Sequence, residues 1–485
     1  MTDKLKQKLM YDAIIIGAGI SGLVCGCYLA KAGMKVLIVE QHDKPGGYCT
    51  SFKRKGFTFD AAAHSFGSYR KNGNMRLILK VLDLDKRIKI KRYTPSDIII
   101  TPDYRVVFWA NINKTIQEFQ NAFPHESRKV KDFIYYLVNS KPIDFIALRK
   151  KTFKDLLDQY FYDNKLKSIL SLPILGIGAL PPSLISAFTG SKILAEFFLD
   201  GGYYPSGGMQ ALPDAFTERF KEFGGELRLS CLVRRILVKN NEVKGIVLEN
   251  GESITSRHVV SNCDARQTFF KLLGEKVVKK EILNKINSMI PSLSLFILYL
   301  GIDKPFRSLP KPGTNMWFLP HYNIEDMYIS AKDRKINNLD AHMVRLSPDK
   351  KTILAFANAP YKNEKYWNDN KYKFIDAFVK RIEQYTFPEL SKHIVYKDAA
   401  TPYTLYRYTL NSKGAAYGWA STPSQLFTPE LRQTTTIKGL FLSGHWTTQT
   451  QGIPGVAYIG YDTAKLILKK EGNINESKRI HRKKS

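Results

Sequence analysis

The sequence predicts an α/β protein that begins with a parallel strand–helix–strand unit. Three observations lead to this prediction. Residues 11–40 read in order as a buried strand, a glycine turn, a helix and a second strand. Residues 225–264 read as short strands of alternating polarity, joined by Asn-Asn and Asn-Gly turns. Residues 439–468 read as a strand followed by a helix that opens with glycine.

The N-terminal unit is assigned from its apolar runs and its glycines. Tyr11–Ile16 (YDAIII) is an apolar run typical of a buried strand, and Lys35–Glu40 (KVLIVE) is the second such run. Gly17–Gly22 form a tight turn, and Leu23–Ala32 form the helix, which ends at Gly33. A parallel unit of this kind is expected to have a right-handed connection.

The middle of the chain is mixed. Residues 70–200 read as mostly helical, and His258–Ser261 and Pro291–Ile302 read as further strands. Ser168–Ser191 contains no charged residue. Its prolines and glycines argue against a membrane-spanning helix, because they leave backbone groups unpaired. We interpret this stretch as a tunnel wall or as an element that dips into a membrane.

Composition limits the class of protein and of partner. The chain has 485 residues, of which 44% are hydrophobic, so it is neither disordered nor a simple repeat. Its net charge of +30 favours anionic partners such as nucleic acid, anionic lipid or acidic substrates, or reflects compositional drift. No helix-turn-helix, zinc or RNP-type signature supports nucleic acid. Five cysteines without a C-x-x-C pair argue against a disulfide framework and a metal site, which suggests a cytoplasmic protein.

The glycine turn has the spacing of a dinucleotide-binding motif. Gly17-Ala18-Gly19-Ile20-Ser21-Gly22 matches G-x-G-x-x-G in the required context, after a strand and before a helix. The glycines permit a tight turn, close approach to a pyrophosphate and close helix–strand packing. The helix N-terminus supplies N–H groups for the phosphates. Glu40, 18 residues after Gly22, is placed to accept hydrogen bonds from ribose hydroxyls.

A second glycine pair distinguishes a flavin from a nicotinamide cofactor. Gly46 and Gly47 follow Glu40 by six residues. They would bring a second backbone loop against the dinucleotide, which an ordinary nicotinamide domain does not need. The pair therefore favours a flavin dinucleotide.

With these motifs, the chain resembles the phytoene desaturase, carotenoid isomerase and retinol saturase family of flavoproteins. The resemblance runs from Tyr11 to about Leu468 and depends on IIIGAGISGLVCGCYLAKAGMKVLIVEQHDKPGGYCTSF, GFTFDAAAHSFG, YYPSGGMQALPDAF, VVSNCD, TPYTLYRYTLNSKGAAYGW and GLFLSGHWTTQTQGIPGVAYIG. It implies a Rossmann-like FAD-binding domain that is discontinuous, with an interleaved α+β substrate-binding domain. The implied FAD domain comprises residues 1–70, 201–290 and 430–470, the substrate domain residues 71–200 and 291–429, and residues 471–485 form a basic tail.

The resemblance assigns the cofactor-binding residues by position. In this reading Val233 meets the adenine through its backbone, and Gly444 approaches the pyrophosphate or ribityl chain. The C-terminal glycine-opened helix lies at the isoalloxazine. The full set is Gly17, Ala18, Gly19, Ser21, Gly22, Glu40, Gln41, Gly46, Gly47, Val233, Gly444, Gly452, Ile453, Pro454 and Val456. Two positions differ from the wider superfamily. Many of its members have Arg where this chain has Tyr48, and Asp where this chain has His445.

The resemblance implies an FAD-dependent oxidoreductase that desaturates, saturates or isomerises carbon–carbon bonds of a carotenoid-like or other isoprenoid lipid. A quinone, oxygen or a reductase would exchange electrons with the flavin. Two alternatives stay open. One is a flavin amine oxidase or porphyrinogen oxidase from the same superfamily. The other is a non-catalytic prenyl-lipid carrier.

The cofactor itself carries hydride transfer, so the sequence indicates few residues for acid–base chemistry. His64 and His445 are the candidates; the alternative for each is a packed or hydrogen-bonded histidine. Tyr406–Tyr408 resembles a family stretch, and the alternative is a strand with alternating aromatic faces.

A basic flank precedes the uncharged Ser168–Ser191 stretch and suggests peripheral contact with an anionic membrane surface. The alternative is a solvated helix followed by a core segment. The flank comprises Arg149, Lys150, Lys151, Lys154, Lys165 and Lys167.

Overall fold

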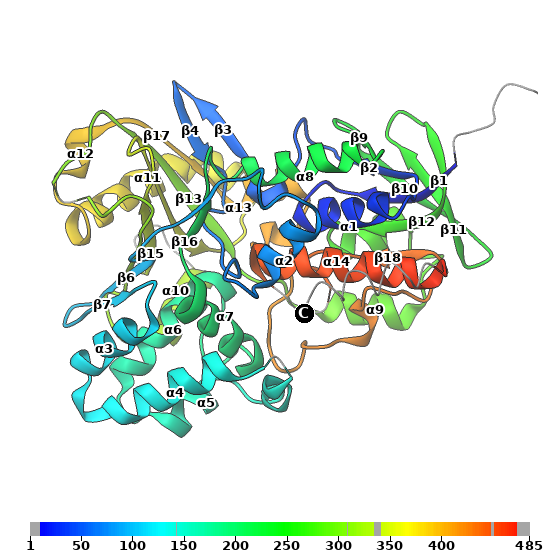
Figure 1. Ribbon diagram of the computed structural model, residues 1–485. Coiled ribbons are helices and arrows are strands. Elements are labelled where there is room, and N and C mark those ends of the chain that lie inside the picture. The colour runs from blue at the N-terminus through cyan, green and yellow to red at the C-terminus, as the bar shows by residue number, and fades with distance from the viewer. Residues whose placement is uncertain (1–9, 142, 308, 334–340, 448–450, 473–485) are drawn as a thin grey trace, which may run out of the picture.

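Two seven-stranded sheets organise the computed structural model of the protein. The structure describes residues 10–141, 143–307, 309–333, 341–447 and 451–472. The first sheet lies on the right of Figure 1 and the second on the left, with helices packed around both. This architecture confirms the predicted α/β class.

The first sheet is built around the N-terminal unit. Its strands are β1 (Tyr11–Ile16), β2 (Val36–Val39), β9 (Glu226–Arg228), β10 (Val233–Lys239), β11 (Glu242–Leu248), β12 (Ser253–Ser261) and β18 (Leu440–Leu442). β1 pairs in parallel with β2 and β12, and parallel β9 and β18 extend the sheet on either side. β10 and β11 continue antiparallel from β12. The sheet thus joins segments from the start, the middle and the end of the chain.

Helices from the start, the middle and the end of the chain cover one face of this sheet. They are α1 (Ile20–Lys31), α2 (Asn74–Val81), α8 (Ala211–Glu222) and α14 (Gly452–Lys470). Figure 1 shows α1, in blue, beside α14, in red. A Cβ atom at Gly460 of α14 would lie 2.3 Å from the carbonyl oxygen of Ser21 in α1, so only glycine allows this approach. The Ser21 Oγ also accepts from the backbone N–H of Gly444, at 3.0 Å.

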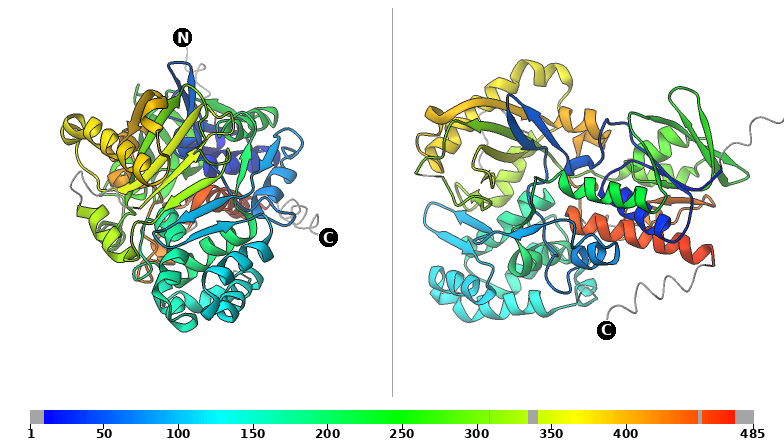
Figure 2. Two further views of the ribbon diagram at one scale, coloured as in Figure 1. Left: turned by 90° about the vertical axis from the view of Figure 1, so that its left-hand side faces the viewer. Right: turned by 45° about the horizontal axis from the view of Figure 1, so that its top comes forward.

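The second sheet is antiparallel except where β14 meets β6. Its strands are, in order across the sheet, β17 (Ile394–Ala400), β13 (Ser294–Ile302), β16 (Thr352–Ala359), β15 (His342–Leu346), β14 (Asn315–Phe318), β6 (Asp97–Ile100) and β7 (Arg105–Phe108). Alternate side chains of β13 face opposite sides, as a strand period of two requires. Phe296 and Leu298 pack toward α11 (Glu364–Tyr385), whereas Leu295 and Ile297 pack toward a helical layer. Figure 2 shows α11 and this layer on opposite sides of the sheet.

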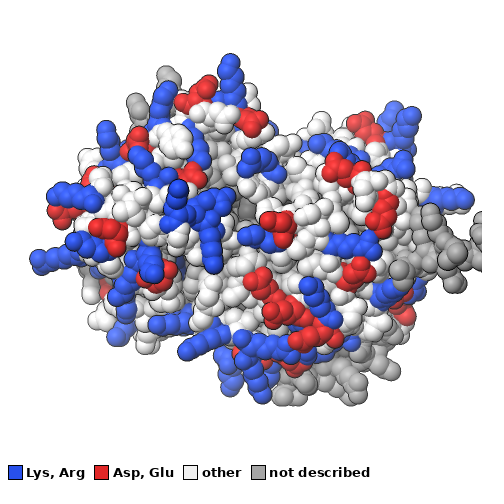
Figure 3. Space-filling model, turned by 90° about the horizontal axis from the view of Figure 1, so that it is seen from above, with Lys and Arg blue, Asp and Glu red and all other residues white. Residues whose placement is uncertain are grey.

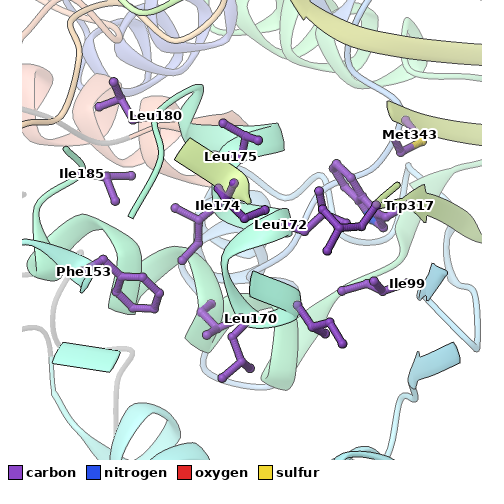
Figure 4. Close-up of a cluster of buried hydrophobic side chains, with 14 of the residues drawn as sticks. Ile99, Phe153, Leu170, Leu172, Ile174, Leu175, Leu180, Ile185, Trp317 and Met343 are labelled. Atoms are coloured by element: carbon purple, nitrogen blue, oxygen red, sulfur yellow. The ribbon is translucent and has the colours of Figure 1, made fainter. Parts of the chain in front are cut away.

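The helical layer contains the uncharged stretch of the sequence. Its helices are α3 (Ile112–Ala122), α4 (Ser127–Asn139), α5 (Phe153–Tyr160), α6 (Asn164–Gly178) and α7 (Ala187–Asp200). Figure 4 shows apolar side chains of α6 among those of Phe153, Ile185 and Trp317. A Cβ atom at Gly176 would lie 2.2 Å from the Trp317 ring. The α6 part of Ser168–Ser191 is therefore core, which corrects its interpretation as a membrane-dipping element.

The remaining strands and α-helices lie in the connections between the strands of the two sheets. They are the hairpin β3 (Ser51–Arg54) and β4 (Phe57–Asp60), the pair β5 (Ile90–Arg92) and β8 (Tyr203–Pro205), and the helices α9 (Lys280–Ser288), α10 (Ile324–Asp333), α12 (Leu390–His393) and α13 (Pro402–Thr409). The predicted domain boundaries stay a prediction. Residues 473–485 of the predicted basic tail lie outside the described residues.

Substituting Gly460 by Ala is expected to destabilise the fold by about 1–3 kcal/mol, because the new methyl group would meet backbone that cannot move aside. Gly26→Ala in α1 is the matched control: its Cβ would meet only side-chain ends, with Ile38 Cδ1 at 2.7 Å. Thermal unfolding of both variants measures the difference. Equal losses would contradict the close contact of α1 with α14.

Candidate active site

A cavity of about 1010 Å³ extends from the first sheet to the second. Ile16 and Val39, the last residues of β1 and β2, lie in its wall together with Leu295 and Phe356 of the second sheet. The cavity therefore lies outside the carboxyl ends of the parallel strands, where open α/β sheets bind ligands.

The glycine turn of the N-terminal motif forms one end of this cavity. Gly17 has φ = +99°, a left-handed conformation that favours glycine. A Cβ atom at Gly22 would lie 2.2 Å from the Gly17 carbonyl oxygen, so this position also requires glycine. Gly19 precedes α1, and no side chain caps the helix N-terminus. Its free N–H groups are thus available for an anionic ligand, as phosphate binding at a helix N-terminus requires.

Glu40 lies against this turn. Its Oε2 accepts from the backbone N–H of Ala18 at 2.7 Å, and its Oε1 accepts from that of His42 at 2.9 Å. Burial raises the pKa of the Glu40 carboxyl. The carboxylate lines the cavity next to Gln41, so its remaining lone pairs are available to a bound ligand.

Asn262 connects the Gly17–Gly22 turn to the loop at Gly444. The sequence analysis gave it no role. Its Nδ2 donates to the Gly17 carbonyl at 3.2 Å. Its Oδ1 would lie 2.5 Å from a Cβ atom at Gly444, and its Nδ2 would lie 3.1 Å from one at Gly19. The amide therefore fills the space that these glycines leave. Its sequence signals were its place just after a buried strand, β12, and its position in VVSNCD, one of the segments on which the resemblance depends.

A second uncapped helix begins at the same cavity. Gly452, with φ = +73°, opens α14, and no side chain caps that N-terminus. Gln451 lies beside it, and its buried Oε1 has no hydrogen-bond partner among the described residues. Gly46 and Gly47 also have positive φ values, and Gly46 forms a bridge with Gly19. Backbone from both ends of the chain thus surrounds one ligand-sized space.

The structure brings together nearly all the residues predicted to bind a cofactor. Ala18 and Gly22 do not line the cavity; they shape the turn behind it. The lining residues among those predicted are Gly17, Gly19, Ser21, Glu40, Gln41, Gly46, Gly47, Val233, Gly444, Gly452, Ile453, Pro454 and Val456. Two free helix N-termini, glycine backbone and a buried carboxylate form a donor and acceptor set that fits a dinucleotide.

His445 belongs to a hydrogen-bonded group of side chains beside the loop at Gly444. The Asn411 Nδ2 lies 3.4 Å from its Nε2 and donates to the Tyr48 Oη at 3.1 Å, while Tyr48 donates to the Ala415 carbonyl at 2.9 Å. Burial lowers the pKa of His445 to about 4. The imidazole is therefore neutral at pH 7, which disfavours its candidate role as a proton donor.

His64 lies elsewhere in the cavity wall. Its ring is 5.4 Å from that of Phe356, and its Nδ1 lies 3.3 Å from the Ala62 carbonyl oxygen. Burial, with a smaller effect of the Arg345 charge, lowers the pKa of His64 to about 3. This histidine is also neutral at pH 7. Tyr406–Tyr408 lies in helix α13, so its interpretation as a strand was wrong.

The wall away from the glycine loops is largely apolar. Asp97 is a buried exception: it accepts from the Asn315 Nδ2 at 2.9 Å and from the Trp317 Nε1 at 2.8 Å. Burial raises the pKa of this carboxyl. The apolar lining side chains are Ile177, Phe188, Ile193, Phe197, Leu295, Trp317, Phe356 and Leu405.

Within the described part of the chain, no group of His, Cys, Asp and Glu side chains is arranged to hold a metal ion. The cysteines are all free thiols.

The fold and the site define a dinucleotide-binding protein of the flavoprotein class. Residues 20–468 match the model of the flavin-containing amine oxidoreductase family, and the chain belongs to this family. Its cofactor is FAD.

Relatives match over most of the chain. The chain is 27% identical to a chloroplastic prolycopene isomerase of Daucus carota, covering 93% of this chain and 78% of that one. It is 25% identical to an all-trans-retinol 13,14-reductase of Danio rerio, covering 89% and 82%. It is 27% identical to a lycopene-forming phytoene desaturase of Pantoea ananas, covering 95% and 99%.

Solved structures share the fold. An oxidoreductase from Methanosarcina mazei superposes with a TM-score of 0.64 at 17% identity, covering 93% of this chain and 99% of that one. A putrescine oxidase variant superposes with a TM-score of 0.66 at 16% identity, covering 95% and 99%.

Replacing Glu40 by Gln is expected to weaken FAD binding roughly 10- to 100-fold, because an amide N–H₂ would face a backbone N–H donor. Titration of FAD into the apoprotein, followed by flavin fluorescence, measures this loss. Glu252→Gln, at an exposed ion pair with Arg228, is the control and should bind FAD normally. Unchanged affinity in Glu40→Gln would contradict the role assigned to the carboxylate.

Proposed function

We propose that the protein is an FAD-dependent oxidoreductase that desaturates, saturates or isomerises carbon–carbon bonds of a carotenoid-like or other isoprenoid lipid. The observation that carries this proposal is the continuity of one cavity from the dinucleotide-binding loops to an apolar wall. A long apolar substrate suits such a wall, because its burial is driven by the hydrophobic effect. The carotenoid and retinoid relatives support the same substrate class.

The contribution of the chain is positioning and exclusion of water. When bound, FAD supplies hydride transfer to or from the substrate carbon. Aromatic and aliphatic side chains, including Phe197, Trp317 and Phe356, would hold the chain of the substrate in a dry site. Neutral His64 and His445 would serve as hydrogen-bonding groups there, since their lowered pKa values keep both uncharged at pH 7.

The alternative functions have less support. An amine oxidase takes an alkylammonium substrate, which the ammonium group of Lys192 in the cavity wall would repel. A non-catalytic lipid carrier needs no flavin, whereas this chain belongs to an FAD family and keeps two free helix N-termini at the site.

Anaerobic mixing of the purified holoprotein with polyenes tests the proposal. A desaturase bleaches its oxidised flavin when substrate is added, and a saturase re-oxidises a chemically reduced flavin. An isomerase changes the product geometry with reduced flavin and no net colour change. Flavin absorbance and product mass are followed together, with boiled protein plus free FAD as the control. A chain that oxidises amines but changes no polyene would contradict the proposal.

A lipid substrate would enter the cavity through the surface next to it. No described helix has the length and apolar character needed to cross a bilayer. Thr152 forms a bridge with Ser186, and the buried Ser186 N–H donates to the buried Ser421 carbonyl, so that three segments of the chain meet here. Leu184 and Phe427 are exposed there, and the Phe427 ring lies 5.2 Å from that of cavity residue Phe188.

Basic residues flank this apolar surface, and three of the six residues of the predicted flank form ion pairs. Lys154 and Lys167 pair with Asp158, and Lys165 pairs with Asp103. The exposed remainder is Arg149, Lys150 and Lys151. On the face in Figure 3, by contrast, basic side chains are scattered among acidic ones. We therefore propose the 149–151 segment as the part that contacts anionic lipid.

Reversing the charge of Arg149, Lys150 and Lys151 to Glu should sharply reduce sedimentation with anionic liposomes, since each basic residue contributes about 1 kcal/mol near such a surface. The matched control reverses Lys276, Lys279 and Lys280, which are exposed before and at the start of α9, and should sediment like the wild type. Equal sedimentation of the two triple variants would argue against the 149–151 segment.

A further inference from the structure

The cavity contains one ammonium group that the proposed hydride chemistry does not use. Phe188, Lys192 and Glu196 follow one another at four-residue intervals on α7, and all line the cavity. This spacing places them on one face of the helix. Thr189, Ile193 and Phe197 line the cavity from the neighbouring face. One helix thus presents a cation beside the apolar wall.

Lys192 makes no ion pair within the described part of the chain, although the negative charge of Glu196 acts on it through space. It forms no hydrogen bond with the described residues, and its Nζ lies 5.1 Å from the centre of the Phe188 ring. The nearest acid along the helix face, Glu196, is occupied, because both of its oxygens accept from Arg70 at 2.9 Å. Arg70 also binds Asp200, at 2.8 Å.

The carboxylate farther along the wall is likewise occupied. Asp97 accepts from Asn315 and Trp317, as described above. Lys192 is partly buried, and desolvation lowers the pKa of its ammonium group, an effect that the charge of Glu196 opposes. A buried charge without a partner is unfavourable, and a bound anion removes that cost.

We propose that Lys192 binds the carboxylate end of the substrate, so that the preferred substrate is a polyisoprenoid acid rather than a pure hydrocarbon. This inference rests on the proposed function and names its substrate class. A carboxylate would form a charge-assisted hydrogen bond with the Nζ, while the apolar chain packs along Ile193 and Phe197. A hydrocarbon would leave the ammonium group unpaired, and an alkylammonium group would be repelled.

Lys192 lies close to the part of the cavity that is proposed to bind the cofactor. A Cβ atom at Gly178 would lie 3.6 Å from the Ile193 Cδ1 and 3.7 Å from the Gln451 Oε1. The next residue of α7 after Lys192 therefore lies near the N-terminus of α14. A chain anchored at Lys192 runs along a wall that reaches the dinucleotide-binding loops.

Binding of three matched probes tests the anchor: a C20 conjugated polyene acid, its methyl ester and its alcohol. Quenching of tryptophan fluorescence reports binding, since Trp317 lines the cavity. The wild-type holoprotein should bind the acid roughly 10- to 100-fold more tightly than the ester or the alcohol. Lys192→Met, which keeps the apolar stem, should abolish this preference, and Lys192→Arg should restore most of it.

Lys131→Met on the exposed surface of α4 is the control and should keep the wild-type preference. Retained FAD and an unchanged unfolding temperature show that Lys192→Met is folded. Equal affinities of wild type for acid and ester, failure of all three probes to bind, or a preference that survives Lys192→Met would overturn the inference.

The assay separates this inference from the proposed function, because binding needs no turnover. Polyene turnover without an acid preference would overturn the anchor alone. An acid preference that depends on Lys192, without turnover of any polyene, would uphold the anchor and contradict the proposed reaction.

Discussion

The close packing of α1 against α14 is the constraint on which the rest of the structure depends. These helices come from opposite ends of the chain, and they meet where Gly460 leaves room for the Ser21 carbonyl. The Ser21 Oγ lies 2.7 Å from the Ser443 Oγ and accepts from the Gly444 N–H. These buried contacts fix the two glycine loops relative to each other. Without them the phosphate-binding turn and the C-terminal loop would not share one cavity.

The same constraint determines the electrostatics of the site. Two uncapped helix N-termini point into one space and favour a negatively charged dinucleotide. Beyond that space the cavity becomes apolar, and its histidines are neutral because burial lowers their pKa values. An environment of this kind binds and orients the reactants and leaves the redox chemistry to the cofactor. Lys192, which makes no ion pair with the described residues, departs from this pattern.

The sequence predicted the features that depend on neighbouring residues. It did not predict those that depend on contacts between residues far apart in the chain. The glycine spacing and the apolar runs are local, so β1, β2 and the turn between them were predicted, although α1 begins at Ile20 because the motif itself forms its first turn. Tyr406–Tyr408 showed an alternating pattern, but Thr401 caps a helix there. Lys192 carries no local signal, and the local signal at Asn262, its place after a buried strand in the segment VVSNCD, does not reveal its role. Their roles arise from residues far along the chain, Gly17 and Gly444 for Asn262 and the Arg70–Glu196 pair for Lys192.

A double-mutant cycle on Ser21→Ala and Ser443→Ala, read out as the dissociation constant of FAD, tests most directly whether both ends of the chain hold the cofactor together. Because the two hydroxyls bond to each other, removing the second after the first should cost little. The predicted coupling free energy is about 0.5 kcal/mol or more, as for residues in contact. Strictly additive losses, or no loss of FAD affinity in any of the three variants, would contradict the account.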